Sequence, residues 1–299
     1  MDQAGLKRPT SNQRWLWWGL GSFFALVMAF KIGTWSNGSS SDGPGKKVGI
    51  VNINGPIVSA ESTVKQLEKF RSRNDITAII LRIDSPGGLV APTQEIYEKV
   101  KSVRKEKPVV SSLGTVAASG GYYIAVAADT LMANPGTIVG SIGVIIQYPV
   151  LTELLDKVGI KFETVKSGKL KDVGSYSRNV TDADRVHLNA MVTDMYNQFV
   201  DAVSESRTIA KEDVILLADG RVFTGLQSKE LGLIDVIGTY EDAITLAGLM
   251  GNISGKPKTV RKQKKRPSLL DWFSGNLGQT VSSWFDELPA YRWRMEEES

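Results

Sequence analysis

The stretch "TVAASGGYY" (Thr115–Tyr123) decides how the middle of this chain folds. It follows the apolar run "PVVSSLG" and precedes "IAVAAD", so a buried strand is predicted to meet a helix at a serine and two glycines. Ser119 could cap that helix, because serine is a favoured N-cap residue. At a sharp strand-to-helix turn, the same hydroxyl could act as a nucleophile. Taken alone, the pattern favours the cap.

Strands and helices alternate on both sides of this junction. Before it, "KVGIVNINGPIV" and "ITAIILRIDSP" predict strands, and "TVKQLEKFRSR" and "APTQEIYEKVKSVRKE" predict helices. After it, "TLMAN" and "IKFETV" predict strands, the latter preceded by the helix "TELLDKVG". A long helix from Asp182 to Arg207 opens at a Thr181 cap, followed by shorter helices in "KEDVILLADG" and "YEDAITLAGLM". This order predicts an α/β fold, a largely parallel sheet layered with flanking helices.

Composition limits the chemistry that the chain can perform. The 299 residues are 42% apolar and 23% charged, which is an ordinary globular mixture and argues against a disordered chain. There is no cysteine, which excludes disulfides, thiolate nucleophiles and cysteine-bound zinc. His187 is the one histidine, so a Ser-His mechanism would depend on that residue alone. We expect no metal and no cofactor.

The positive charge is confined to one segment. Seven lysines and arginines lie between Lys256 and Arg266 with no acidic residue among them, and the net charge of the chain is +4. The rest of the chain is therefore slightly acidic, which argues against nucleic acid as a partner. A basic tail on an acidic body favours contact of the tail alone with an anionic surface.

An uncharged segment, "WLWWGLGSFFALVMAF", occupies residues 15–30. As a helix it would reach about 24 Å, and continuing to Trp35, with Lys31 extending to the interface, would span a hydrocarbon core of about 30 Å. Tryptophans at both ends are typical of an aromatic belt. We predict a cytoplasmic N-terminus (1–14), a transmembrane anchor (15–35) and a flexible stalk (36–45).

Three basic residues (Lys7, Arg8 and Arg14) precede the anchor, which predicts a single-pass protein with its N-terminus in the cytoplasm and the body outside. The alternative is a cleaved signal peptide, but no A-x-A-like site follows the apolar run. Both alternatives export the body.

Residues 46–251 form the predicted catalytic domain, and residues 252–299 a basic linker and an amphipathic tail. The tail contains "SLLDWFSGNLGQTVSSWFDEL", whose apolar residues have near-helical spacing. It would lie on membrane lipid, or pack on the body or on a second copy of the chain. The sequence leaves these alternatives open.

Three motifs bear on acyl-transfer chemistry, although each of them alone also has an ordinary structural explanation: a common strand-to-helix turn, a helix cap and a solvated lysine loop. "DSPGG" (Asp84–Gly88) ends a strand and starts a helix, so the amides of Gly87 and Gly88 could bind a developing oxyanion. Ser119 is followed by Gly120, whose amide would lie beside the serine hydroxyl at a helix start. "SGKLKD" (residues 167–172) supplies lysines, and a lysine base needs a pKa lowered from about 10.4 to about 7 or 8, which requires burial.

These motifs, with "SGGYYIAVAAD", "GTIVGSIGV" and "ADGRVFTGLQSKELGLID", resemble in kind and order those of the signal peptide peptidase A family in its short membrane-anchored form. That family contains Ser-Lys proteases of the Clp protease/crotonase superfamily. The resemblance covers about residues 46–251. It implies a Clp protease/crotonase-like fold and an ATP-independent serine endopeptidase.

The resemblance also implies the residues of the site. Ser119 would be the nucleophile, Lys171 the general base, with Lys169 as its rival, and Ser141 the hydroxyl that holds the lysine amine. Gly88 and Gly120 would donate the oxyanion-hole hydrogen bonds, with Gly87 as the alternative to Gly88. "GRVFTG" and "GLID" would be scaffold.

The family implies substrates, assembly and place. The substrates would be signal peptides left in the membrane after secretion, and the chain would form homo-oligomers in which the lysine of one subunit serves the serine of its neighbour. The catalytic domain would lie on the outer side of a bacterial inner membrane, in the periplasm or on the cell-wall side. Two alternatives remain: a related membrane-bound protease acting on other membrane or misfolded exported proteins, and a catalytically idle oligomeric scaffold.

Overall fold

The computed structural model describes residues 45–261. Its elements, in chain order, are β1 (Lys47–Asn54), α2 (Glu61–Ser72), β2 (Ile76–Ser85), α3 (Val90–Arg104), β3 (Val109–Ala118), α4 (Gly120–Ala125), β4 (Thr130–Ala133), β5 (Ile138–Gly140), α5 (Thr152–Lys157), α6 (Asp182–Arg207), α7 (Lys211–Leu217), β6 (Val222–Thr224), α8 (Gly225–Glu230), β7 (Val236–Ile237), α9 (Tyr240–Met250) and β8 (Lys258–Arg261). The predicted anchor, stalk and amphipathic tail lie outside the described residues. Within residues 45–261, no helix is both long and apolar enough to cross a bilayer.

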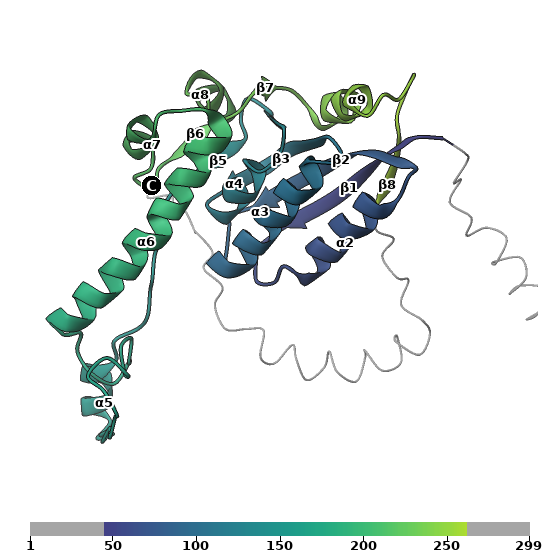
Figure 1. The fold of residues 1–299 in the computed structure, drawn as a ribbon. Coiled ribbons are helices and arrows are strands. Elements are labelled where there is room, and N and C mark those ends of the chain that lie inside the picture. Colours follow the sequence, from purple (N-terminus) through teal and green to yellow (C-terminus); the bar gives the residue numbers. More distant parts are fainter. Residues whose placement is uncertain (1–44, 262–299) are drawn as a thin grey trace, which may run out of the picture. The chain divides into compact units, whose positions relative to one another are not determined.

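One sheet organises this part of the chain (Figure 1). Its strands are ordered β6-β5-β3-β2-β1-β8, with β4 pairing β3 and β7. Every pairing in it is parallel except β5 with β6. The predicted α/β fold with a largely parallel sheet is therefore confirmed.

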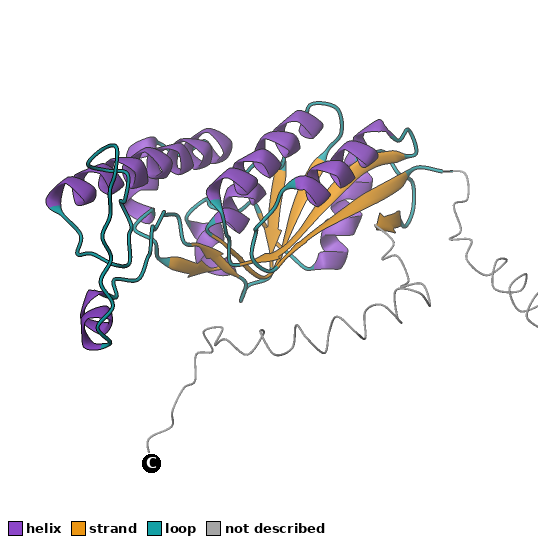
Figure 2. Ribbon diagram, turned by 90° about the horizontal axis from the view of Figure 1, so that it is seen from below, coloured by secondary structure: helices purple, strands orange, loops and turns teal. Residues whose placement is uncertain are grey.

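Helices cover both faces of the sheet, as Figure 2 shows. Alternate strand residues face opposite sides, so Val51 and Ile53 of β1 join the core under α2, α3 and α4, whereas Val48 and Ile50 join the core under α9. The central strands are buried on both faces, which explains why their sequences are almost continuously apolar.

Strand β3 changes partner along its length, and this change sets up the site. Its first part pairs with β4, and its last residues pair with β5. Between them the register with β2 shifts, and the Asp84 side chain accepts a hydrogen bond from the Val116 amide (3.1 Å). The irregularity directs the end of β3 toward the carboxyl end of β2.

Residues 141–181 and the first part of α6 form an arm that runs away from the sheet, with α5 near its far end (Figure 1). The long helix begins and ends at the predicted residues. Its start is fixed by a capping box formed by Thr181 and Asp184. The strand predicted at "IKFETV" is wrong: residues 160–165 form no strand. They alternate suitably, but they lie on the arm, where no neighbouring strand pairs with them.

The sheet also extends beyond the predicted end of the domain. Strand β8, inside the segment assigned to the basic linker, pairs in parallel with β1. Its Lys258 and Arg261 are exposed, as is usual on an edge strand. The sheet therefore includes the start of the basic segment.

Candidate active site

Ser119 occupies a strained turn between β3 and α4. Its φ of 50° and ψ of −123° are unusual for a residue other than glycine, and such strain is concentrated at functional sites. The turn is fixed on both sides: the Ser119 amide donates to the Gly140 carbonyl (2.8 Å), and its carbonyl accepts from the Tyr123 amide (2.9 Å). Although Ser119 is the N-cap residue of α4, its side chain makes no capping hydrogen bond. The strain therefore does not serve a cap.

The loop between β2 and α3 lies directly against this turn. A Cβ atom on Gly87, whose φ is +104°, would be 2.8 Å from both the Ser119 Cβ and the Gly120 nitrogen. A Cβ on Gly120 would in turn be 2.7 Å from Thr93 Oγ1. Only glycine therefore allows the two backbones to approach this closely.

The amides of this loop are not equivalent. The Gly87 amide donates to Ser85 Oγ (3.1 Å), which itself donates to the Gly55 carbonyl (2.7 Å). The amides of Gly88 and Gly120 have no hydrogen-bond partner within residues 45–261. Of the predicted oxyanion donors, the geometry thus favours Gly88 over Gly87.

Ser141 lies beside Ser119 because the two serines follow paired residues, Ala118 in β3 and Gly140 in β5. Ser141 also has a positive φ, 49°. Its amide donates to the Arg221 carbonyl (2.8 Å), just before β6, so the "GRVFTG" motif holds the strand end that carries Ser141. The structure therefore gathers Ser119, Ser141 and the glycine loop on one side of the sheet.

Lys171 is not part of this group. It is exposed in a loop of the arm, where its amide donates to the Gly168 carbonyl (3.2 Å), and Lys169 is exposed in the same loop. The loop is fastened to the start of α6 at Asp184, whereas Phe199 of α6 packs on Tyr123 of α4 with ring centroids 4.8 Å apart. Asp184 and Phe199 are separated by about 22 Å of helix. The exposed His187 lies on the same arm and is likewise remote from Ser119.

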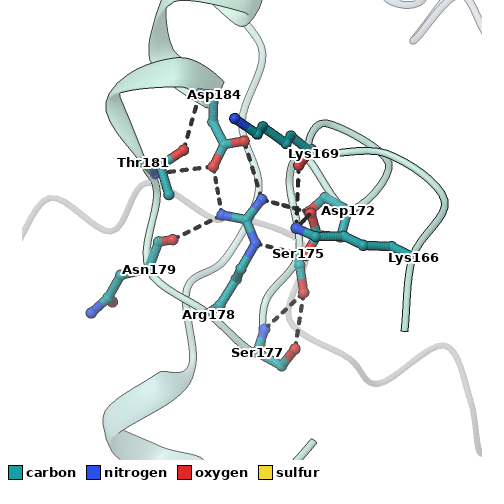
Figure 3. A network of polar contacts seen from close by, with 9 residues as sticks. All are labelled: Lys166, Lys169, Asp172, Ser175, Ser177, Arg178, Asn179, Thr181 and Asp184. Carbon is teal, nitrogen blue, oxygen red and sulfur yellow. Dashed lines mark hydrogen bonds and ion pairs between the residues drawn. The ribbon is translucent and has the colours of Figure 1, made fainter. Parts of the chain in front are cut away.

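Charged groups fasten the lysine loop to α6 (Figure 3). Arg178 bonds the carboxylates of both Asp172 and Asp184, and Lys166 donates to Asp172 Oδ1 (2.6 Å). These bonds, those of Arg178 first, hold the pKa of both carboxyls well below their usual range. The sequence interpretation did not identify Arg178, although Asp172, Arg178 and Asp184 recur at intervals of six residues.

Apolar side chains of the arm face solvent in the single chain. Val165 is 96% exposed, Ile145 85% and Val186 71%. Further exposed apolar residues of the arm are Leu154, Val158, Ile160 and Phe162. Exposed apolar side chains in this number on one arm are typical of a surface that meets another macromolecule.

Comparison with known proteins assigns the family. The model of peptidase family S49 matches residues 101–253, and that of Clp protease matches residues 47–139. The chain belongs to peptidase family S49. The Clp protease match agrees with the layered sheet and its flanking helices.

Three relatives of this S49 chain carry protease names. It is 42% identical over 249 residues to "Putative protease slr0021" of Synechocystis sp., covering 79% of the chain and 90% of that relative. It is 32% identical over 249 residues to "Serine protease SPPA, chloroplastic" of Arabidopsis thaliana (80% of the chain, 37% of the relative). It is 35% identical over 185 residues to "Putative signal peptide peptidase SppA" of Enterococcus faecium (62% and 54%). The chain thus spans most of the first relative but only a part of the other two.

Proposed function

We propose that this S49 protein is a membrane-anchored serine endopeptidase that degrades signal peptides remaining after secretion, with Ser119 as nucleophile and Lys171 as general base. The backbone of Ser119 carries the proposal. A non-glycine residue at φ 50° stores strain, and its hydroxyl makes no capping bond beside the amide of Gly120. This is the arrangement that a nucleophile at a helix start requires.

The chemistry assigns each group one task. The Lys171 amine accepts the Ser119 proton as Oγ bonds to the scissile carbonyl carbon, and the amides of Gly88 and Gly120 bind the oxyanion. The C–N bond then breaks, and the lysine returns the proton to the leaving amine. This leaves an ester between Ser119 Oγ and the acyl part of the peptide, which water hydrolyses by the same route with the lysine again as base. Ser141 would hold the lysine amine in its neutral form.

A second copy of the chain completes the site in this proposal. Lys171 is held at the far end of α6, about 22 Å of helix from the residue that packs beside the Ser119 turn. It is exposed there, whereas a lysine base requires burial. The exposed apolar side chains of the arm support burial against a neighbouring subunit.

Apolar substrates fit the rim of the site. Val58 is 69% exposed and Leu89, which follows Gly88, is 57% exposed. The two side chains come from segments that are joined by a hydrogen bond from the Leu89 amide to the Ile57 carbonyl (2.8 Å). Apolar side chains at this rim support binding of the apolar segment of a signal peptide. The relative from Enterococcus faecium carries the name of such a peptidase.

Labelling and cleavage test the proposal together. A fluorophosphonate should label Ser119 in the full chain, and Ser119→Ala and Lys171→Ala should each lose cleavage of a synthetic signal peptide. Folding of both variants is checked by circular dichroism. Cleavage at the parent's rate by both variants would refute the dyad, and labelling without any cleavage would favour another substrate class.

A further inference from the structure

Arg178 connects the predicted base to the long helix. Its Nε donates to Asp172 Oδ2 (2.8 Å) and its Nη2 to Asp172 Oδ1 (2.9 Å) and to the Asp172 carbonyl (3.2 Å). Asp172 directly follows Lys171, so these bonds fix both the side chain and the carbonyl of the next residue. The backbone that carries Lys171 is thereby held from one side.

The other edge of the guanidinium holds α6. Nη1 donates to Asp184 Oδ2 (2.5 Å) and to the Asn179 carbonyl (3.0 Å), and Nη2 donates to Asp184 Oδ1 (3.1 Å). Every N–H direction of the guanidinium is therefore used. Asp184 is only 2% exposed and also accepts from the Thr181 amide (3.0 Å), so Arg178 is fastened to the capping box of the helix.

We propose that Arg178 is a positioning residue that sets where α6 presents the Lys171 amine to the serine of a neighbouring subunit. The inference rests on the proposed function, since it takes Lys171 as the base. The planar fork of arginine fixes two carboxylates in one plane, whereas a lysine at 178 would supply a point charge without that geometry. Lys166 also holds Asp172, but among residues 45–261 Arg178 alone joins Asp172 to Asp184 of α6.

The effect should appear in catalysis and leave peptide binding alone. Displacing a reacting group by about 1 Å can cost about 100-fold in rate. Arg178→Gln should therefore lower kcat about 100-fold and leave KM within about twofold, because Lys171 reacts with Ser119 and does not bind the peptide. Arg178→Lys should also lose most of kcat, although it keeps the charge.

The chain offers a matched control. Arg71 likewise joins two carboxylates, with Nε to Glu68 Oε2 (2.9 Å) and Nη1 to Glu106 Oε1 (2.7 Å), on α2 and away from the arm. Arg71→Gln should leave kcat unchanged. A general loss of surface ion pairing would affect both variants alike.

Mixed assemblies give the decisive test. Co-expressed Ser119→Ala and Lys171→Ala chains should regain about a quarter of the parent's activity on a synthetic signal peptide, since one interface in four joins an intact serine to an intact lysine. Adding Arg178→Gln to the Ser119→Ala chain, which donates the lysine, should lower that activity about 100-fold. Adding it to the Lys171→Ala chain should not.

Each outcome decides one question. Loss of activity in both arrangements would mean that Arg178 serves folding or assembly, and loss in neither would mean that it does not position the base. Either result overturns the inference. Full activity of the Lys171→Ala chain by itself, or no regained activity in the parent mixture, would instead refute the shared dyad of the proposed function.

Discussion

Replacing Gly88 with alanine tests whether the loop after β2 supplies an oxyanion donor. A Cβ atom at Gly88 would lie 2.2 Å from the carbonyl oxygen and 2.5 Å from the nitrogen of Ile57. Both are backbone atoms and cannot rotate away as a side chain could. Non-bonded heavy atoms are in favourable contact at about 3.5 Å, so the backbone at Gly88 and the backbone at Ile57 would have to separate by about 1 Å.

That separation has two costs. It strains the hydrogen bonds from the Ile57 amide to the Gly87 carbonyl and from the Leu89 amide to the Ile57 carbonyl, each 2.8 Å. At about 0.5–1.5 kcal/mol each, their loss would lower the free energy of unfolding by about 1–3 kcal/mol. It also moves the Gly88 amide, and loss of one oxyanion donor costs about 10²–10³-fold in kcat.

The assay compares Gly88→Ala with Gly136→Ala on a fluorogenic peptide, with denaturant unfolding in parallel. Gly136 is a suitable control because its Cβ would meet nothing within 4 Å. We expect Gly136→Ala to match the parent in both measurements. A Gly88→Ala protein that keeps the parent's kcat while losing stability would show that this amide does not bind the oxyanion.

Four further predictions concern the arm, the core and the chemistry. Arg178 lowers the pKa of Asp184 below the ordinary 3.8. The ionised carboxylate therefore stabilises the fold above that pH, and this contribution is lost as the pH falls further. In an acid titration followed by circular dichroism, Asp184→Asn should weaken the fold at pH 7 and remove this acid-dependent loss. Phe199→Ala, at a side chain 3% exposed, should cost about 3–5 kcal/mol in denaturant unfolding, because it leaves a cavity beside Tyr123. Val165→Asp should reduce the mass of the detergent-solubilised assembly while leaving the circular dichroism spectrum unchanged, because it places a charge on an apolar surface of the arm. A chelator should leave peptide cleavage unchanged, because the Ser-Lys mechanism supplies its own nucleophile and base.

The parts of the fold that depend on local signals could be predicted from the sequence. The start of the helix at 182–207 was predictable because Thr181 and Asp184 form a capping box within four residues. Its end was not signalled in the same way, because Thr208 is β-branched and still adopts the left-handed conformation at φ 53°. The central strands were predictable because burial on both faces makes them continuously apolar. These signals require no knowledge of distant parts of the chain.

Elements that depend on distant partners could not be predicted in this way. The sequences of residues 160–165 and of β8 are both compatible with a strand, but only β8 has a free edge, that of β1, beside it. In the site, the junction at Ser119 was evident, whereas its φ of 50°, its unused capping position and the close approach of Gly87 appear only in the folded chain. Arg178 was missed because its two carboxylates meet only once the arm has folded.

A single helix separates the two halves of the proposed site. The C-terminal half of α6 packs on α4 through Phe199, and its first turn holds the Lys171 loop through Asp184. Sharp kinks in helices arise mostly at proline, at glycine or where the hydrogen-bond ladder is interrupted, and α6 contains neither proline nor glycine. The distance between a chain's own Ser119 and Lys171 is therefore fixed by the length of a straight helix. On the proposed dyad, a lone chain cannot close its site by bending, so activity should follow assembly rather than folding.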